Sequence, residues 1–102
     1  MNNTIWSNDK ERILSSGNIY YKEDSVVRKN GSSFFRNGER FGFSNGNTTF
    51  VAGGTVRVSG NVIFTPKGEY RLNGDVLFGP NGKSWRGVSS IDKARDIAVM
   101  DQ

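Results

Sequence analysis

The sequence predicts an all-β protein, an antiparallel meander of short hairpin repeats closed into a small barrel or sandwich, with one short C-terminal α-helix. A glycine is followed four residues later by an aromatic residue five times, at steps of 14 or 15 residues. Apolar residues make up only 34% of the chain and glycine occurs 13 times, which suits short strands and many turns. Asn-Gly dipeptides recur between β-favouring runs, and Asn-Gly is a strong hairpin signal.

Each repeat contains two expected strands. The first strand ends at the aromatic residue and covers residues 19–21, 33–35, 48–50, 62–64 and 76–78. Three β-favouring residues in a row are typical of burial on both faces, so we expect most of the aromatic residues to lie in the core. The second strand, at 26–28, 40–43, 56–58, 70–72 and 84–86, alternates apolar and polar residues, which indicates one buried and one exposed face.

The turns support hairpins over the other repeat architecture that fits, a β-solenoid of 14-residue coils. Asn-Gly at positions 30, 37, 45, 73 and 81 suits a two-residue type I′ turn, which needs positive φ at both central residues. In a solenoid, equivalent residues would stack about 4.8 Å apart, so repeated arginines would repel one another. We therefore favour the antiparallel meander.

The two ends of the chain differ from the repeats. Near the N-terminus, a helix over Asn8 to Leu14 competes with a strand over Arg12 to Ser15, and the repeat pattern slightly favours the strand. Near the C-terminus, Ser89 and Ser90 precede an amphipathic run, which predicts a helix over 90–100. A helix this short is marginal alone. We expect it to dock over an open sheet edge or onto another subunit.

Length and composition narrow the functional class. With 102 residues, we expect one domain, with residues 12–88 forming the hairpin region. The chain has no cysteine and no histidine, so it lacks the usual general base and the commonest metal ligands. Asp92 and Asp96 could share a helix face, but capping explains Asp92 more simply. We expect no enzyme activity, no cofactor and no metal site. No apolar run reaches membrane-spanning length, so we expect no membrane contact and a cytoplasmic protein.

Positive charge gathers in the repeats. Residues 25–86 carry nine Lys/Arg against three Asp/Glu, whereas each end of the chain has a net charge of −1. Arginines recur at equivalent places in the second strands, with Gly42 in the place of one of them. Regular cations near aromatic rings suit a phosphodiester backbone and stacked bases, as in small barrels that bind single strands. The predicted binding residues are Arg28, Arg57, Arg71, Arg86, Lys67, Lys83, Phe34 and Trp85.

Two functions therefore remain open. The first is a binding module that contacts nucleic acid, or an acidic surface of a protein that handles nucleic acid, through the arginine face. The second is a structural or inhibitory protein that acts by protein–protein contact and forms a homo-oligomer through the C-terminal helix or a sheet edge. The Asn/Gly/Ser-rich style resembles many phage and mobile-element accessory proteins, a likeness of composition that rests on no specific motif. Glu39 and Glu69 offer the arginines simple surface ion pairs instead.

Overall fold

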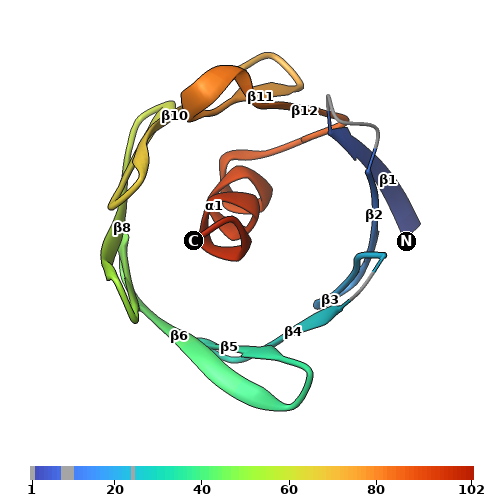
Figure 1. The fold of residues 1–102 in the computed structure, drawn as a ribbon, viewed down its shortest axis with the longest axis vertical. Helices are drawn as coiled ribbons and strands as arrows, with labels where there is room; N and C mark the ends of the chain where they lie inside the picture. The colour runs from blue at the N-terminus through green and yellow to red at the C-terminus, as the bar shows by residue number, and fades with distance from the viewer. Residues whose placement is uncertain (1, 8–10, 24) are drawn as a thin grey trace.

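In the computed structural model, which describes residues 2–7, 11–23 and 25–102, the chain forms a closed antiparallel barrel of twelve strands around one α-helix (Figure 1). The strands are β1 (Asn2–Ser7), β2 (Arg12–Ser16), β3 (Ile19–Tyr21), β4 (Val26–Asn30), β5 (Ser33–Arg36), β6 (Glu39–Asn45), β7 (Thr48–Val51), β8 (Gly54–Ser59), β9 (Val62–Thr65), β10 (Gly68–Asn73), β11 (Val76–Phe78) and β12 (Ser84–Arg86). A 3₁₀ turn, η1 (Pro80–Gly82), precedes β12, and α1 (Ile91–Met100) follows it. The predicted all-β hairpin fold with a C-terminal helix is confirmed, and the solenoid is not supported.

The N-terminal strand β1 closes the barrel. It pairs with β2 along most of its length and with β12 at Trp6↔Arg86 and Ser7↔Trp85. The β region predicted from the sequence begins at residue 12, so it does not include this strand. Residues 12–16 form a strand, which is the alternative that the repeat pattern favoured over a helix from Asn8 to Leu14. Residues 8–10 of that expected helix lie outside the described residues.

Most turns have a different register from the one predicted. In the hairpin between β10 and β11, Asn73 pairs with Val76, so Asn73 ends the strand and Gly74-Asp75 forms the two-residue loop. Gly74 has a φ of 65°, whereas Asp75 is not among the residues with positive φ, so the turn is not type I′. The hairpin between β5 and β6 does match the prediction, because Asn37 and Gly38 both have positive φ, at 50° and 92°.

Strand β6 interrupts the regular repeat. Phe34 pairs with Gly42 and Phe35 pairs with Arg40, which leaves Phe41 as an extra residue, a β-bulge. Gly42 is buried and faces the interior. The residue equivalent to the repeated arginines is therefore Phe43, and the expectation that Gly42 takes that place is wrong.

Alternation of side chains separates the core from the outer surface. The buried apolar residues of the barrel wall are Ile5, Ile13, Tyr20, Val27, Phe34, Val56, Ile63, Tyr70, Leu77 and Trp85. Together with Val88, they surround Ala94, Ile97, Ala98, Val99 and Met100 of α1. The core is thus one cylinder of wall side chains packed on a helix.

Helix α1 lies inside the barrel (Figure 1). Ser90 caps it as predicted, because its side chain accepts a hydrogen bond from the backbone N–H of Lys93 at 3.2 Å. The expectation that the helix covers a sheet edge or docks on another subunit is wrong. A sheet that closes on itself has no edge to cover, and its lumen offers the helix a largely apolar surface. A homo-oligomer built through this helix or a free edge is therefore not supported.

Candidate nucleic-acid interface

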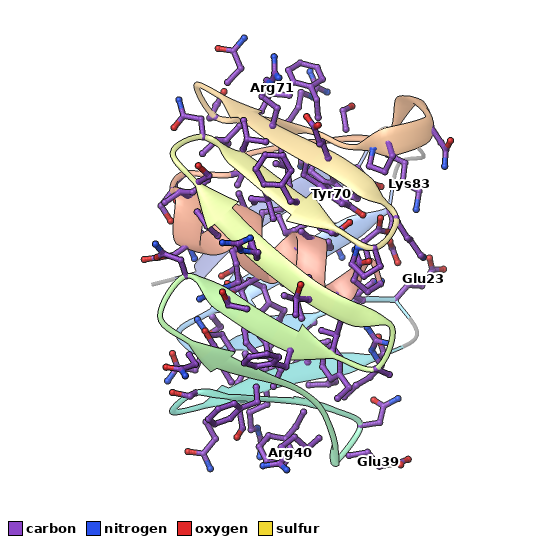
Figure 2. All side chains as sticks on the ribbon, turned by 90° about the vertical axis from the view of Figure 1, so that its left-hand side faces the viewer. Glu23, Glu39, Arg40, Tyr70, Arg71 and Lys83 are labelled. Carbon is purple, nitrogen blue, oxygen red and sulfur yellow. The ribbon has the colours of Figure 1, made fainter. Side chains whose placement is uncertain are left out.

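All four predicted arginines lie exposed on the outer face of the barrel. Arg28, Arg57, Arg71 and Arg86 belong to β4, β8, β10 and β12. Figure 2 shows Arg71 pointing away from the barrel, whereas its neighbour Tyr70 points toward the helix. This opposition follows from the two-residue period of a strand.

Each of these arginines faces an aromatic residue on a neighbouring strand. The pairs in register are Arg28↔Phe35, Arg57↔Phe64, Arg71↔Phe78 and Arg86↔Trp6. Two further pairs occupy the equivalent positions of the remaining hairpins, Leu14↔Tyr21 and Phe43↔Phe50. Directly opposite residues have Cβ atoms about 5 Å apart, so each pair presents its two side chains side by side. We call these twelve residues the outer belt.

The outer belt contains every large apolar side chain that is exposed in the described part of the chain. The exposed fractions are 46% for Trp6, 37% for Leu14, 42% for Tyr21, 44% for Phe43, 49% for Phe50, 45% for Phe64 and 48% for Phe78. Phe35 is half-buried. Single exposed apolar residues are ordinary, but a continuous set on one surface indicates contact with a partner. The expectation that most of the repeated aromatic residues belong to the core is therefore wrong.

In the described part of the chain, the guanidinium groups of the belt arginines are unpaired. None of the four guanidinium groups makes an ion pair or a hydrogen bond within residues 2–7, 11–23 and 25–102. Glu69 lies opposite Phe64 and does not pair with Arg71, and Glu39 lies opposite Arg36 at the β5–β6 turn. The simple explanation of the arginines as surface ion pairs with these two glutamates is thus not realised.

Shallow grooves on the outer surface combine the two kinds of side chain. A groove of about 540 Å³ is lined by Arg28 and Phe35 among others, and one of about 300 Å³ by Arg57 and Phe64. A third, of about 420 Å³, contains Arg12 with Trp6 and Tyr21. Each groove therefore places a cationic group beside an aromatic ring, which suits a ligand that is both anionic and planar.

Both aromatic residues of the predicted binding site are buried. Phe34 is 1% exposed and Trp85 is 5% exposed, and both belong to the core around α1. The Trp85 ring lies 5.8 Å from the ring of Tyr70, and the Arg95 guanidinium lies 5.5 Å from the Phe34 ring inside the barrel. Neither ring can stack on a surface partner, so these two assignments are wrong. The physical reason is alternation: Trp85 precedes the outward-facing Arg86 and must face inward.

Two predicted lysines bind the end of the helix instead of lying on the arginine face. Lys67 donates to the backbone carbonyl of Asp101 at 2.7 Å, and the Lys83 ammonium lies 2.8 Å from the Asp101 carboxylate. Tyr70 donates its hydroxyl to the same carboxylate. Burial, with the hydrogen bond to Asp101, raises the pKa of Tyr70 well above its usual value. These lysines stabilise the negative end of the helix dipole.

A second polar cluster lies near the middle of the lumen. Asp96 is 1% exposed, and it accepts hydrogen bonds from Tyr20, from Lys29 at 3.1 Å and from Arg95 at 2.9 Å. Burial, and then the Asp96 carboxylate, raise the pKa of Tyr20 well above its usual value. Sequence analysis missed this cluster, because its members are up to 76 residues apart and no local pattern connects them.

The aromatic half of the outer belt was also missed, although the sequence carries a signal for it. A two-residue loop pairs an arginine of the strand before it with the residue seven positions later, as in Arg57 and Phe64. The same spacing joins Arg28 to Phe35 and Arg71 to Phe78. Residues that pair directly share a face, so an exposed arginine implies an exposed aromatic ring.

A small cavity and the arrangement of the carboxylates bear on chemistry other than binding at the outer belt. A polar cavity of about 40 Å³, lined by Glu11, Lys22, Lys83 and Asp101 among others, lies beside the helix C-terminus. Such a volume holds little more than water. In residues 2–7, 11–23 and 25–102, no three Asp or Glu side chains gather to hold a metal ion. The same part of the chain has no helix of the length and apolarity that crossing a bilayer requires.

Comparison with known proteins gives no match: no family model, no curated protein and no solved structure is significantly similar to this chain.

Proposed function

We propose that this protein is a non-enzymatic binding module that holds nucleic acid against the arginine–aromatic pairs of the outer belt. The observation that carries the proposal is the repeated pairing of an exposed aromatic ring with an arginine that has no ion pair among the described residues, as in Phe64 with Arg57 and Phe78 with Arg71. Arginine donates to phosphate oxygens in a planar fork, and aromatic rings stack on bases. An acidic protein surface would use the cations but leave the rings without a matching partner.

The distribution of charge supports the same ligand. Residues 25–86 carry a net charge of +6, whereas the chain as a whole carries +4. Two cations of this region, Lys29 and Lys83, form ion pairs with Asp96 of α1 and with Asp101, which follows the helix. The belt arginines form none among the described residues, so the unneutralised positive charge is concentrated on the outer surface. A field of this kind attracts polyanions.

The test is binding of fluorescent single-stranded and duplex oligonucleotides over a series of salt concentrations. We expect log K to fall linearly with log salt, with a slope of about −0.7 for each phosphate contacted on a single strand and about −0.9 on a duplex. The double variant Arg57→Gln/Arg71→Gln should bind more weakly, with a slope less steep by about 1.4 for a single strand.

The matched control is Asn45→Glu/Asn47→Glu. This double variant also lowers the net charge by two, but its residues are exposed at the β6–β7 turn, outside the outer belt. It should bind nearly as well as the natural protein. Absence of binding at low salt would remove nucleic acid from consideration, and equal losses in both double variants would show that net charge alone matters.

One observation favours the second function, contact with another protein. Phe43 and Phe50 face each other on the outer surface, 44% and 49% exposed, with no arginine in their pair. Apolar pairs of this kind are typical of protein–protein contact surfaces. If the protein self-associates through them, Phe43→Thr/Phe50→Thr should lower the sedimentation coefficient at high protein concentration. An unchanged profile would count against this second function.

A further inference from the structure

The arginine–aromatic pairs are concentrated on one half of the barrel. On the six neighbouring strands from β8 through β12 to β1, arginine and aromatic residues alternate strand by strand. The order is Arg57, Phe64, Arg71, Phe78, Arg86 and Trp6, all of them exposed. We call this set the arginine arc. In the opposite half, from β2 to β7, Arg28 is the only arginine of the belt, and one ring, Phe35, lies opposite both Arg28 and the exposed Arg40.

The pairing registers make the arginine arc continuous. Within each hairpin the arginine lies directly opposite its ring, and at the seam Trp6 lies opposite Arg86 on one side and Arg12 on the other. Between hairpins the neighbours are diagonal: Arg71 is opposite Val62, two residues before Phe64. Diagonal neighbours lie about 7–8 Å apart, still within reach of long side chains. Cations and rings therefore follow one another around the barrel without a gap.

This arrangement and the curvature of the barrel favour a flexible ligand. The Cα trace measures 27 × 26 × 22 Å, and the arginine arc runs around half of its circumference. Duplex DNA stays straight over such a length, since its persistence length is about 150 base pairs. A straight rod touches a convex surface along a narrow line and reaches only a few adjacent strands. A single strand can bend around the whole arc.

The rings between the arginines point to the same conclusion. A ligand that contacts Arg57 and Arg71 must also cover Phe64, which lies between them. A duplex would cover this ring with sugar and phosphate, because its bases are stacked on one another inside the helix. A single strand has free base faces, and stacking of a base on an aromatic side chain is favourable for every base.

From this geometry we infer that the arginine arc binds single-stranded nucleic acid, wrapped across the strands from β8 to β1, with phosphates at the arginines and bases on the rings between them. This inference rests on the proposed function and specifies its ligand. Since stacking and phosphate contact are indifferent to base identity, the arc binds single strands with little sequence preference.

The test compares a 12-nucleotide single-stranded oligo-dT and a mixed-sequence single strand with a duplex of the same length. The natural protein should bind both single strands at least about tenfold more tightly than the duplex at equal salt. Removal of rings from the arc in Phe64→Thr/Phe78→Thr should weaken single-strand binding at least about fivefold per ring. Threonine keeps the strand propensity, and both residues are exposed, so the barrel should still fold.

The matched control is Phe43→Thr/Phe50→Thr, which removes two equally exposed rings from the opposite half of the belt. It should leave single-strand binding unchanged. Trp6 supplies a second signal, because the chain has two tryptophans and Trp85 is buried. Stacking on Trp6 should quench the intrinsic fluorescence, and the quenching should disappear in Trp6→Phe while binding remains.

The outcomes separate failure of this inference from failure of the proposed function. Equal affinity for duplex and single strand, with both weakened by Arg57→Gln/Arg71→Gln, would keep the nucleic-acid function and overturn the single-strand assignment. Equal losses in the two ring variants would overturn the assignment to the arginine arc. Absence of binding to all three oligonucleotides at low salt would overturn both.

Discussion

The hydroxyl of Tyr20, on the barrel wall, donates a hydrogen bond to the carboxylate of Asp96, on the helix that fills the lumen. Both residues are almost fully buried, and Lys29 and Arg95 complete the cluster around the carboxylate. The contact joins β3 to the second half of α1. A charged group in such a position is stable only with its partners, so the cluster sets how the helix is rotated within the barrel.

Asp96→Asn should destabilise the protein by about 3 kcal/mol, because it leaves Lys29 and Arg95 without their counter-ion. We expect the lower end of the usual range for a broken buried pair, since the Lys29 side chain is 22% exposed. Urea unfolding measures the change. Asp92→Asn is the control: it makes the same chemical change in the same helix at an exposed position, and should cost less than about 1 kcal/mol.

Tyr20→Phe should lower the unfolding free energy by about 1–3 kcal/mol, because Asp96 loses a buried hydrogen bond while the ring remains. Tyr21→Phe removes the same hydroxyl one residue later on β3, where the side chain is 42% exposed. Its effect should stay within about 0.5 kcal/mol. Similar thermal midpoints for the two variants would contradict the role given to the Tyr20 hydroxyl.

Stability should fall as the pH rises above about 10. Tyrosines of the unfolded chain lose their protons near this pH, whereas burial, and then Asp96, raise the pKa of Tyr20 in the folded protein. The folded state then binds more protons than the unfolded state, so its stability is full below pH 10 and decreases above it, by up to about 1.4 kcal/mol per pH unit.

The raised pKa of Tyr70 acts in the same direction, so the measurement is the difference between the natural protein and Tyr20→Phe in urea unfolding at pH 8 to 11. The variant should lose less stability than the natural protein between pH 10 and pH 11. Parallel curves for the two proteins would show that the pKa of Tyr20 does not differ between the folded and unfolded states.

Gly79→Ala should destabilise the barrel by about 1–3 kcal/mol. A Cβ atom at Gly79 would lie 2.9 Å from the Trp85 ring and 3.0 Å from the Tyr70 ring, and these rings pack in the core. The φ of Gly79 is −112°, so crowding alone causes the loss. Gly53→Ala, where a Cβ atom would meet nothing within 4 Å, should leave the thermal midpoint unchanged or slightly raised.

The local structure of the chain follows from short stretches of its sequence. The repeated glycines and the alternating second strands predict hairpins, and hairpins from Ile19 to Arg36 and from Glu39 to Arg86 are observed. Ser90 predicts the start of α1, which begins at Ile91. The alternation of polar and apolar residues also predicts that Arg57 and Arg71 lie on an exposed face. These features depend on residues within a few positions of one another, and so they can be read from a single stretch of chain.

The position of the helix and the exposure of the aromatic rings depend instead on how the sheet closes. Ile97 and Ala98 show that one side of α1 is apolar, but an open edge and a closed lumen would both satisfy that pattern. Closure depends on pairing Trp6 with Arg86, residues 80 positions apart, and it turns one face of every strand inward at once. The interior of the barrel then has room for α1 and for one layer of inward-facing side chains around it. The rings of Phe64 and Phe78, on the other face, remain outside beside Arg57 and Arg71.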